Sequence, residues 1–173
     1  MFEKYEFELG KAADILVREL IKLKADEILI ITADTNTDMR VVTATARAAF
    51  SVGAKPMVIW LASPSGIGKA ADLNLPQKPL IAVLKEADVW VEFNAQALTY
   101  STTWDVALEE NKRLRYLGLC SMDAGMMVRC VGRTDYRALC EFQTAVFNLT
   151  REAKVVRIIT PAGCDVTFEN DPT

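Results

Sequence analysis

The sequence has 173 residues, of which 51% are hydrophobic and 25% are charged, and its formal net charge is −3. This length and composition predict one soluble globular domain, or one domain with a fragment of another, that needs no disulfide or metal for stability. The slight acidity, without any basic cluster, disfavours nucleic-acid binding, and no apolar run is long enough to span a membrane. The first residues lack the basic and apolar regions of a signal peptide, so we expect a cytoplasmic protein.

Histidine is absent from the sequence. The chain therefore contains no His-based triad and no His-ligated metal, and it lacks the commonest general base for chemistry near neutral pH. The four cysteines are widely spaced, which is typical of reduced, buried thiols: Cys120, Cys130, Cys140 and Cys164. We expect that this chain itself binds no cofactor or metal.

Helical and strand patterns alternate along the chain. In chain order, the first part predicts a helix, a strand, a helix and a strand, over residues 5–24, 27–32, 38–52 and 56–61. The second part predicts a short helix, two strands, a long helix and a last strand, over residues 79–87, 88–93, 114–119, 135–152 and 154–160. Thr37 and Thr134 are the expected caps of the second and last helices. Because strands separated by helices need crossover connections, we predict an α/β fold, a Rossmann-like three-layer sandwich with a mostly parallel sheet of about five strands.

Ligands of such sheets bind beyond the carboxyl ends of the strands. The loops predicted there are 33–37, 62–69, 94–103 and 120–124. The second of them lies within Ser63–Ala70, Ser-Pro-Ser-Gly-Ile-Gly-Lys-Ala, which resembles a phosphate-binding loop. It departs from a Walker loop at Ser63 and Ala70, and Pro76 and Pro79 leave too little room for the helix that a dinucleotide fingerprint opens. We interpret the segment as a connector.

Asp34-Thr35-Asn36-Thr37-Asp38 imitates the start of a calcium loop. Met39 and Thr45 stand where such a loop needs Gly and Glu, so an ion would lack its bidentate ligand. Asp34 and Asn36 are therefore either substrate contacts at the end of a strand or part of the cap of the next helix.

The loop after the third predicted strand mixes amide, hydroxyl and apolar side chains, which suits either a pocket wall or a plain surface loop. Its candidate substrate-binding residues are Asn94, Leu98, Thr99, Tyr100 and Ser101. Glu92 and Asp123 would serve acid–base chemistry if they were buried as a pair, and would otherwise be solvated or capping carboxylates. No nucleophile with a base stands out, so no catalytic residue is assigned.

Five short segments follow one another in an order and spacing that can be compared with known families: Ile30-Ile31-Thr32, Thr37-Asp38-Met39-Arg40, Gly53-Ala54-Lys55, Glu86–Val91 and Val156–Asp165. Their arrangement resembles the N-terminal half of one metalloenzyme family, which contains aminopeptidase T-type metallopeptidases and 2,5-dihydroxypyridine 5,6-dioxygenases. The resemblance covers nearly the whole chain.

In that family a second, C-terminal domain binds the metal through His and carboxylate residues beyond a Gly-x-Asp element, here Gly163-Cys164-Asp165. The resemblance implies that residues 1–160 form the α/β N-terminal-type domain and that 161–173 begin a second domain whose metal-binding part is missing. Iron or another divalent metal is expected in that missing domain or in a partner chain. In the dioxygenase branch, the loop matching Leu98–Ser101 reaches the substrate, often with a His where this chain has Tyr100.

Three functions remain as alternatives. The first is the non-metal half of a metal-dependent enzyme that cleaves a hydroxypyridine-like aromatic ring, with this chain supplying pocket walls and assembly contacts. The second is the matching half of an aminopeptidase T-type metallopeptidase acting on peptides, and the third is a non-catalytic binding module. We expect a homo-oligomer or a complex with a metal-binding partner chain, with Val166 and Phe168 at the assembly surface.

Overall fold

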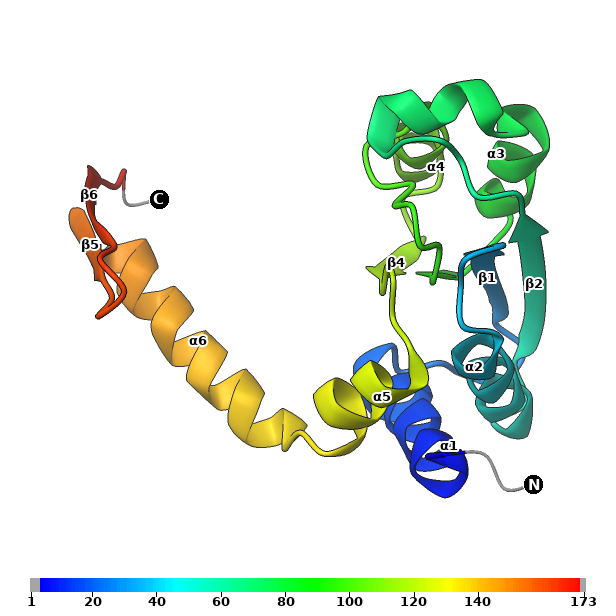
Figure 1. The fold of residues 1–173 in the computed structure, drawn as a ribbon, viewed down its shortest axis with the longest axis horizontal. Helices are drawn as coiled ribbons and strands as arrows, with labels where there is room; N and C mark the ends of the chain where they lie inside the picture. The colour runs from blue at the N-terminus through cyan, green and yellow to red at the C-terminus, as the bar shows by residue number, and fades with distance from the viewer. Residues whose placement is uncertain (1–3, 172–173) are drawn as a thin grey trace. The chain divides into compact units, whose positions relative to one another are not determined.

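The computed structural model describes residues 4–171 and divides the chain into two compact units, residues 1–133 and 134–173 (Figure 1). The boundary predicted from the sequence is a different one. It separates the α/β domain, residues 1–160, from the start of a metal-binding domain, residues 161–173, and it stays a prediction. Within residues 4–171, no helix is both long and apolar enough to cross a membrane.

A four-stranded parallel sheet forms the centre of the N-terminal unit. Its strand order is β2-β1-β3-β4, and all three pairings are parallel. The strands are β1 (Ile28–Asp34), β2 (Lys55–Leu61), β3 (Val89–Glu92) and β4 (Arg115–Gly118). This confirms the predicted Rossmann-like α/β fold, with four strands in the sheet rather than five.

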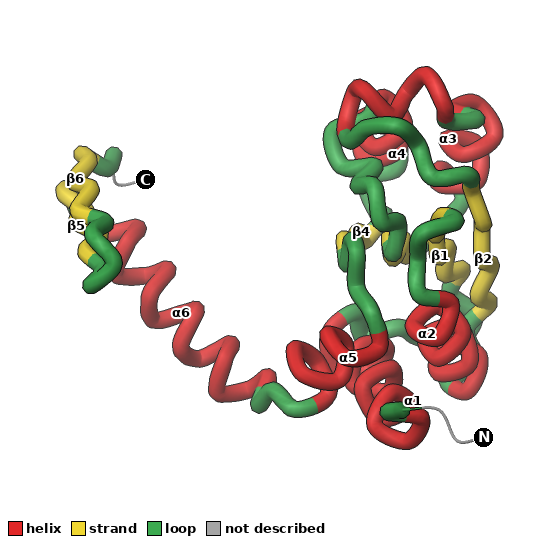
Figure 2. Tube along the Cα trace, viewed as in Figure 1, coloured by secondary structure: helices red, strands yellow, loops and turns green. Residues whose placement is uncertain are grey.

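Helices cover both faces of this sheet, as Figure 2 shows. One face carries α1 (Glu6–Ile15), a π-helical turn (Leu16–Leu20), α2 (Met39–Ser51), α5 (Ala124–Met127) and a second π-helical turn (Val128–Gly132). The other carries a 3-10 segment (Gly68–Asn74), α3 (Gln77–Lys85) and α4 (Thr102–Glu110). The unit is therefore the predicted three-layer sandwich.

The central strands β1 and β3 are buried on both faces, which explains their continuous apolar sequences. Successive side chains point to opposite faces. Leu29 and Ile31 of β1 pack into the core under α1 and α2, whereas Ile30 packs with Leu80 and Leu84 of α3.

Two predicted helix caps lie one residue too early. Asp38, rather than Thr37, caps α2 by accepting a hydrogen bond from the Arg40 amide. Asp135, rather than Thr134, caps the last helix by accepting one from the Ala138 amide. In both cases a threonine precedes an aspartate, and the aspartate carboxylate reaches the exposed amide of the first turn.

The C-terminal unit consists of a helix and a hairpin. Helix α6 (Tyr136–Glu152) is followed by β5 (Val155–Ile159) and β6 (Asp165–Glu169), which pair antiparallel. The prediction that the last strand joins the parallel sheet is wrong, since β5 and β6 form a separate two-stranded sheet. The short connection after Ile159 turns the chain straight back, which makes the pairing of these two strands antiparallel. Gly163 lies in this turn at φ +99°, where a side chain would be strained.

Candidate functional site

The loops that follow β1, β3 and β4 are bonded together at the carboxyl edge of the sheet. Thr32 of β1 and Gly118 of β4 lie in register with Glu92 of β3. The Leu119 amide donates to the Glu92 carbonyl at 2.7 Å, and the Ser121 amide donates to the Asn94 carbonyl at 3.3 Å. Ligands of parallel α/β sheets bind at this edge.

Asp34, the last residue of β1, is buried and fixes two of these loops. Its carboxylate accepts hydrogen bonds from the Asn36 amide at 2.9 Å and the Gln96 amide at 3.1 Å, and the Thr37 hydroxyl lies 3.3 Å from it. Asn36 is exposed, and its side-chain amide donates to the Ser63 hydroxyl at 3.1 Å. Asp34 thus ties the loop after β1 to the loop after β3, and Asn36 ties it to the loop after β2.

Glu92 is completely buried at the end of β3. Its carboxyl group accepts hydrogen bonds from the Leu98 amide and the Tyr116 hydroxyl, both at 2.5 Å. Burial raises the pKa of Glu92, and its hydrogen bonds with Leu98, Tyr116 and Cys120 oppose that rise. Burial, and then the neighbouring Glu92, raise the pKa of the Cys120 thiol to about 12, so this thiol stays protonated near neutral pH.

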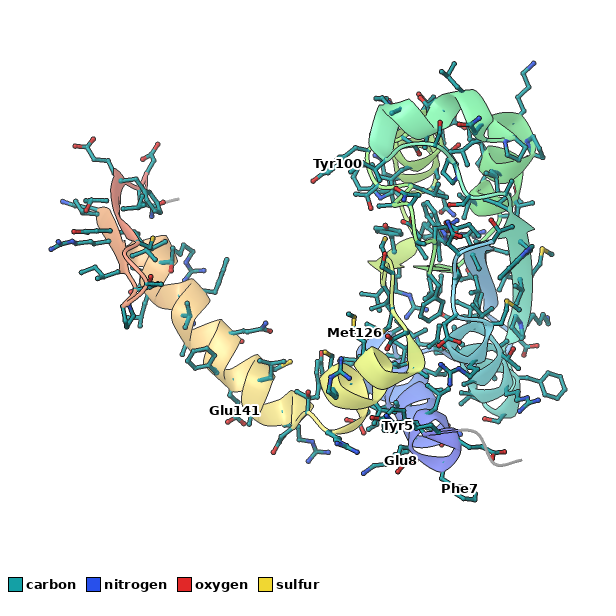
Figure 3. All side chains as sticks on the ribbon, in the orientation of Figure 1. Tyr5, Phe7, Glu8, Tyr100, Met126 and Glu141 are labelled. Carbon is teal, nitrogen blue, oxygen red and sulfur yellow. The ribbon has the colours of Figure 1, made fainter. Side chains whose placement is uncertain are left out.

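The segment 98–101 has one exposed member. Leu98 is buried in the core under α3 and α4, and the Thr99 hydroxyl lies 2.8 Å from the Tyr116 hydroxyl. Ser101 is buried and caps α4 by accepting from the Trp104 amide. Tyr100 is 68% exposed, and in Figure 3 its ring extends away from the ribbon. Leu98 and Ser101 therefore hold the loop, and Tyr100 is presented by it.

Tyr100 has an unfavourable backbone conformation, with φ +66°. Ser121, in the loop after β4, has φ +57°, and its hydroxyl donates to the Ala95 carbonyl. Non-glycine residues in this region cost free energy, and such strain concentrates at functional sites.

Asn94 is the other unusual residue of this edge. Its side chain is completely buried, yet within the described residues neither its Nδ2 nor its Oδ1 has a hydrogen-bond partner. A buried amide in this state costs about 1–3 kcal/mol unless a bound molecule satisfies it. Asn94 is therefore a polar group available to a ligand or a bound water.

The loop Ser63–Ala70 is held by contacts with the segments beside it. The Ser65 hydroxyl donates to the Asn74 side chain at 2.9 Å. Lys69 forms an ion pair with Asp105 of α4 and lies 3.3 Å from the Thr102 hydroxyl. Its lysine is thus engaged with α4, which agrees with a connecting role.

The described residues contain no cluster of metal-ligand side chains. Among residues 4–171, no three His, Cys, Asp or Glu side chains are grouped as ion ligands. Glu92 and Asp123 are not buried as a pair, because Glu92 is completely buried whereas Asp123 is exposed and caps α5 by accepting from the Met126 amide.

The sequence interpretation did not include Tyr116 in the site. A tyrosine within a short strand needs a hydrogen-bond partner for its hydroxyl, and that requirement was the available signal.

The family model of 2,5-dihydroxypyridine 5,6-dioxygenase (NicX) matches residues 15–172. The chain belongs to the 2,5-dihydroxypyridine 5,6-dioxygenase family. This confirms the family resemblance of the sequence. A comparison with curated proteins by sequence gives no match.

Two solved structures have a similar fold to this member of the dioxygenase family. The 2,5-dihydroxypyridine dioxygenase of Pseudomonas putida KT2440 aligns with a TM-score of 0.67 and 18% identity, over 98% of this chain and 49% of that chain. AmpT from Thermus thermophilus, an aminopeptidase T, aligns with a TM-score of 0.61 and 14% identity, over 96% of this chain and 54% of that chain. The chain therefore spans about half the length of these relatives, and at these identities the similarity is one of fold.

Proposed function

We propose that this chain is the non-metal α/β half of a metal-dependent dioxygenase that cleaves the ring of a hydroxypyridine-like aromatic. Membership of the 2,5-dihydroxypyridine 5,6-dioxygenase family supports this choice of chemistry. In this proposal iron or another divalent ion is held by a further domain or a partner chain, because the described residues contain no cluster of metal-ligand side chains. The role of this chain is then to bind and orient the aromatic substrate.

The observation that carries the proposal is the presentation of Tyr100. This side chain is exposed at the carboxyl edge of the sheet, at φ +66°, between the buried residues Leu98 and Ser101. A phenol hydroxyl donates a hydrogen bond to a ring oxygen or a carboxylate. The ring of Tyr100 lies edge-on to that of Trp104, with ring centroids 5.3 Å apart. Tyr100 is thus an aromatic wall with a polar tip.

The remaining substrate contacts come from the same edge. The Asn94 amide is completely buried, so it contacts the substrate only once the loop over it opens; its NH2 group and its oxygen then face ring hydroxyl and nitrogen atoms. Asp34 and Asn36 close the neighbouring side through the loop after β1. In this role Leu98, Thr99 and Ser101 shape the wall, and Tyr100 and Asn94 contact the substrate.

A second candidate is the matching half of an aminopeptidase acting on peptides. The similarity to AmpT favours it, since the TM-score of 0.61 is close to that of the dioxygenase. The same carboxyl edge would then bind a peptide. The two functions differ in the reaction that the assembled enzyme performs, so the assay below includes both substrates.

We also propose that the C-terminal unit is an assembly surface, for a homo-oligomer or for the metal-binding partner. Helix α6, β5 and β6 contain no buried residue. Large apolar side chains are nevertheless exposed there, including Phe142, Phe147, Ile159, Val166 and Phe168. Exposed apolar area of this kind marks an interface. Phe168→Asp should weaken assembly, and an unchanged native mass in this variant would count against the idea.

The test is to purify the chain from its native source and record its native mass and metal content. The same sample is then assayed with 2,5-dihydroxypyridine and with peptides. A metal-containing assembly that cleaves the hydroxypyridine supports the proposal, and one that hydrolyses only peptides supports the aminopeptidase. A metal-free particle made only of this chain, inactive with both substrates, would overturn the proposal and favour a binding module.

A further inference from the structure

The loop that presents Tyr100 is anchored on one buried side chain. One carboxyl oxygen of Glu92 accepts the hydrogen bond of the Leu98 amide, and the other accepts that of the Tyr116 hydroxyl, both at 2.5 Å. The Tyr116 hydroxyl lies in turn 2.8 Å from the Thr99 hydroxyl. Glu92 therefore holds the two residues that directly precede Tyr100, one directly and one through Tyr116.

The anchor itself cannot shift easily. Glu92 belongs to β3, in register with Thr32 of β1 and Gly118 of β4, and none of its surface is exposed. Its two carboxyl oxygens are hydrogen-bonded to the donors around them, and a movement that broke these bonds would leave buried polar atoms without partners, which costs free energy. Because Glu92 is fixed in the sheet, the residues hydrogen-bonded to it are fixed relative to the sheet as well.

Among the described residues, the groups that act on Glu92 include no cation. The ionisable groups that act on it are Tyr116 and Cys120 from the β4 side and Asp34 from β1. Burial and then Glu92 raise the pKa of Tyr116, so its hydroxyl stays protonated near neutral pH and can donate to Glu92. The hydrogen bonds, rather than an ion pair, hold this cluster together.

We propose that Glu92 is the positioning residue of the site, which fixes the backbone from Leu98 to Ser101 and so directs the Tyr100 side chain at the substrate. This inference rests on the proposed function in one respect, that Tyr100 faces the substrate. Glu92 acts through Leu98 and Tyr116 and needs no contact with the substrate itself.

The chemistry of the cluster predicts which substitutions preserve it. In Glu92→Gln, the amide oxygen accepts from Leu98, and the amide nitrogen donates to the Tyr116 oxygen, whose proton turns to Thr99. In Glu92→Leu, neither bond forms. A role that depends on these hydrogen bonds is therefore rescued by Gln and lost with Leu, whereas a role in filling space would be served by Leu as well.

Amide hydrogen exchange of the full chain, resolved by residue, measures the anchoring directly. The Leu98 amide donates to Glu92, and the Ser101 amide donates to the Leu98 carbonyl at 2.9 Å. We expect Glu92→Leu to speed exchange of both amides by about tenfold or more, the ratio that corresponds to one lost hydrogen bond, and Glu92→Gln to stay near the wild-type rate. The matched control is Thr32→Val, which removes the buried bond from Trp90 Nε1 at 2.9 Å and should leave the loop rates unchanged. Wild-type rates in Glu92→Leu, or equally fast exchange in Glu92→Gln, would overturn the inference.

Tyr116→Phe provides a second variant if Glu92→Leu does not fold. It keeps the ring contacts with Trp90 and Trp104 and removes only the hydroxyl. The Ser101 amide should then exchange faster while Leu98, still bonded to Glu92, stays protected. Unchanged exchange at Ser101 would contradict the route through Tyr116.

A kinetic measurement separates this inference from the proposed function. In the native assembly with 2,5-dihydroxypyridine, Glu92→Leu and Tyr100→Phe should both raise KM, and Glu92→Gln should not. If Tyr100→Phe leaves KM unchanged while Glu92→Leu opens the loop, the proposed substrate contact fails and the positioning role stands. If Tyr100→Phe raises KM and Glu92→Leu changes neither exchange nor KM, the positioning role fails alone.

Discussion

Asp34→Asn tests whether the carboxyl edge of the sheet is organised by an internal anchor. The Asp34 carboxylate accepts from the Asn36 and Gln96 amides and lies 3.3 Å from the Thr37 hydroxyl. An asparagine there has one acceptor oxygen and one NH2 group, so in either orientation an amide N–H faces another donor. One charge-assisted hydrogen bond is lost, which costs about 1.5–3 kcal/mol.

Tryptophan fluorescence during urea unfolding reports this loss cleanly. Trp60, Trp90 and Trp104 all belong to the N-terminal unit, so the signal follows the unfolding of that unit alone. With an urea m-value of about 2 kcal/mol/M, the midpoint should fall by about 1 M.

The matched control is Asp14→Asn. Asp14 pairs with Arg18 at 3.4 Å, with side chains 55% and 54% exposed, and exposed pairs of this kind contribute about 0–1 kcal/mol. Its midpoint should move by less than about 0.5 M. An Asp34→Asn midpoint equal to that of the control would refute the reasoning, because the carboxylate would then not hold these loops.

Three further predictions concern other parts of the N-terminal unit. Thr32→Val should lower its free energy of unfolding by about 1–3 kcal/mol, because the buried indole N–H of its β3 neighbour loses its acceptor; equal stability by urea unfolding would contradict this. Burial raises the pKa of Cys120 to about 12, so iodoacetamide at pH 8 should alkylate the exposed Cys164 and leave Cys120 unmodified until the chain unfolds, as read by peptide mass spectrometry; prompt labelling of Cys120 would be the opposite result. The hydrogen bond from Arg40 lowers the pKa of Asp38 to about 2 from the usual 3.8, so its stabilisation is present above about pH 4 and is lost as the pH falls through 2. Asp38→Asn should flatten that part of an acid titration, and a titration identical to wild type would rule out the effect.

The sheet could be predicted because its central strands are buried on both faces. Leu29 to Ile31 and Val89 to Val91 are continuous apolar runs, and short runs of this kind favour buried strands. The strand at Val155–Ile159 has the same apolar character, yet it pairs with β6. Its partner is decided by the length of the following connection, which local sequence pattern does not express.

Helix α4 was missed for a physical reason. Thr102, Thr103 and Trp104 open it, and all have lower helix propensity than Ala or Leu. The Ser101 cap and the burial of Ala107 against the core compensate for this. Tertiary packing therefore decides this helix, and propensity alone does not predict it.

The candidate site was predicted by position more than by role. The rule that ligands bind beyond the carboxyl ends of parallel strands located Asp34, Asn94 and Tyr100 at one edge. The hydrogen bonds that hold this edge together join residues far apart in the sequence, such as Asp34 with Gln96 and Glu92 with Tyr116. No spacing in the sequence reveals such pairs.

The most direct test of the proposed function is oxygen consumption by the assembly purified from its native source, with its metal, on addition of 2,5-dihydroxypyridine. We predict that oxygen is consumed in equal moles with the hydroxypyridine and that Tyr100→Phe slows the reaction at low substrate. A metal-containing assembly that consumes no oxygen with this substrate, whether or not it hydrolyses peptides, would contradict the account.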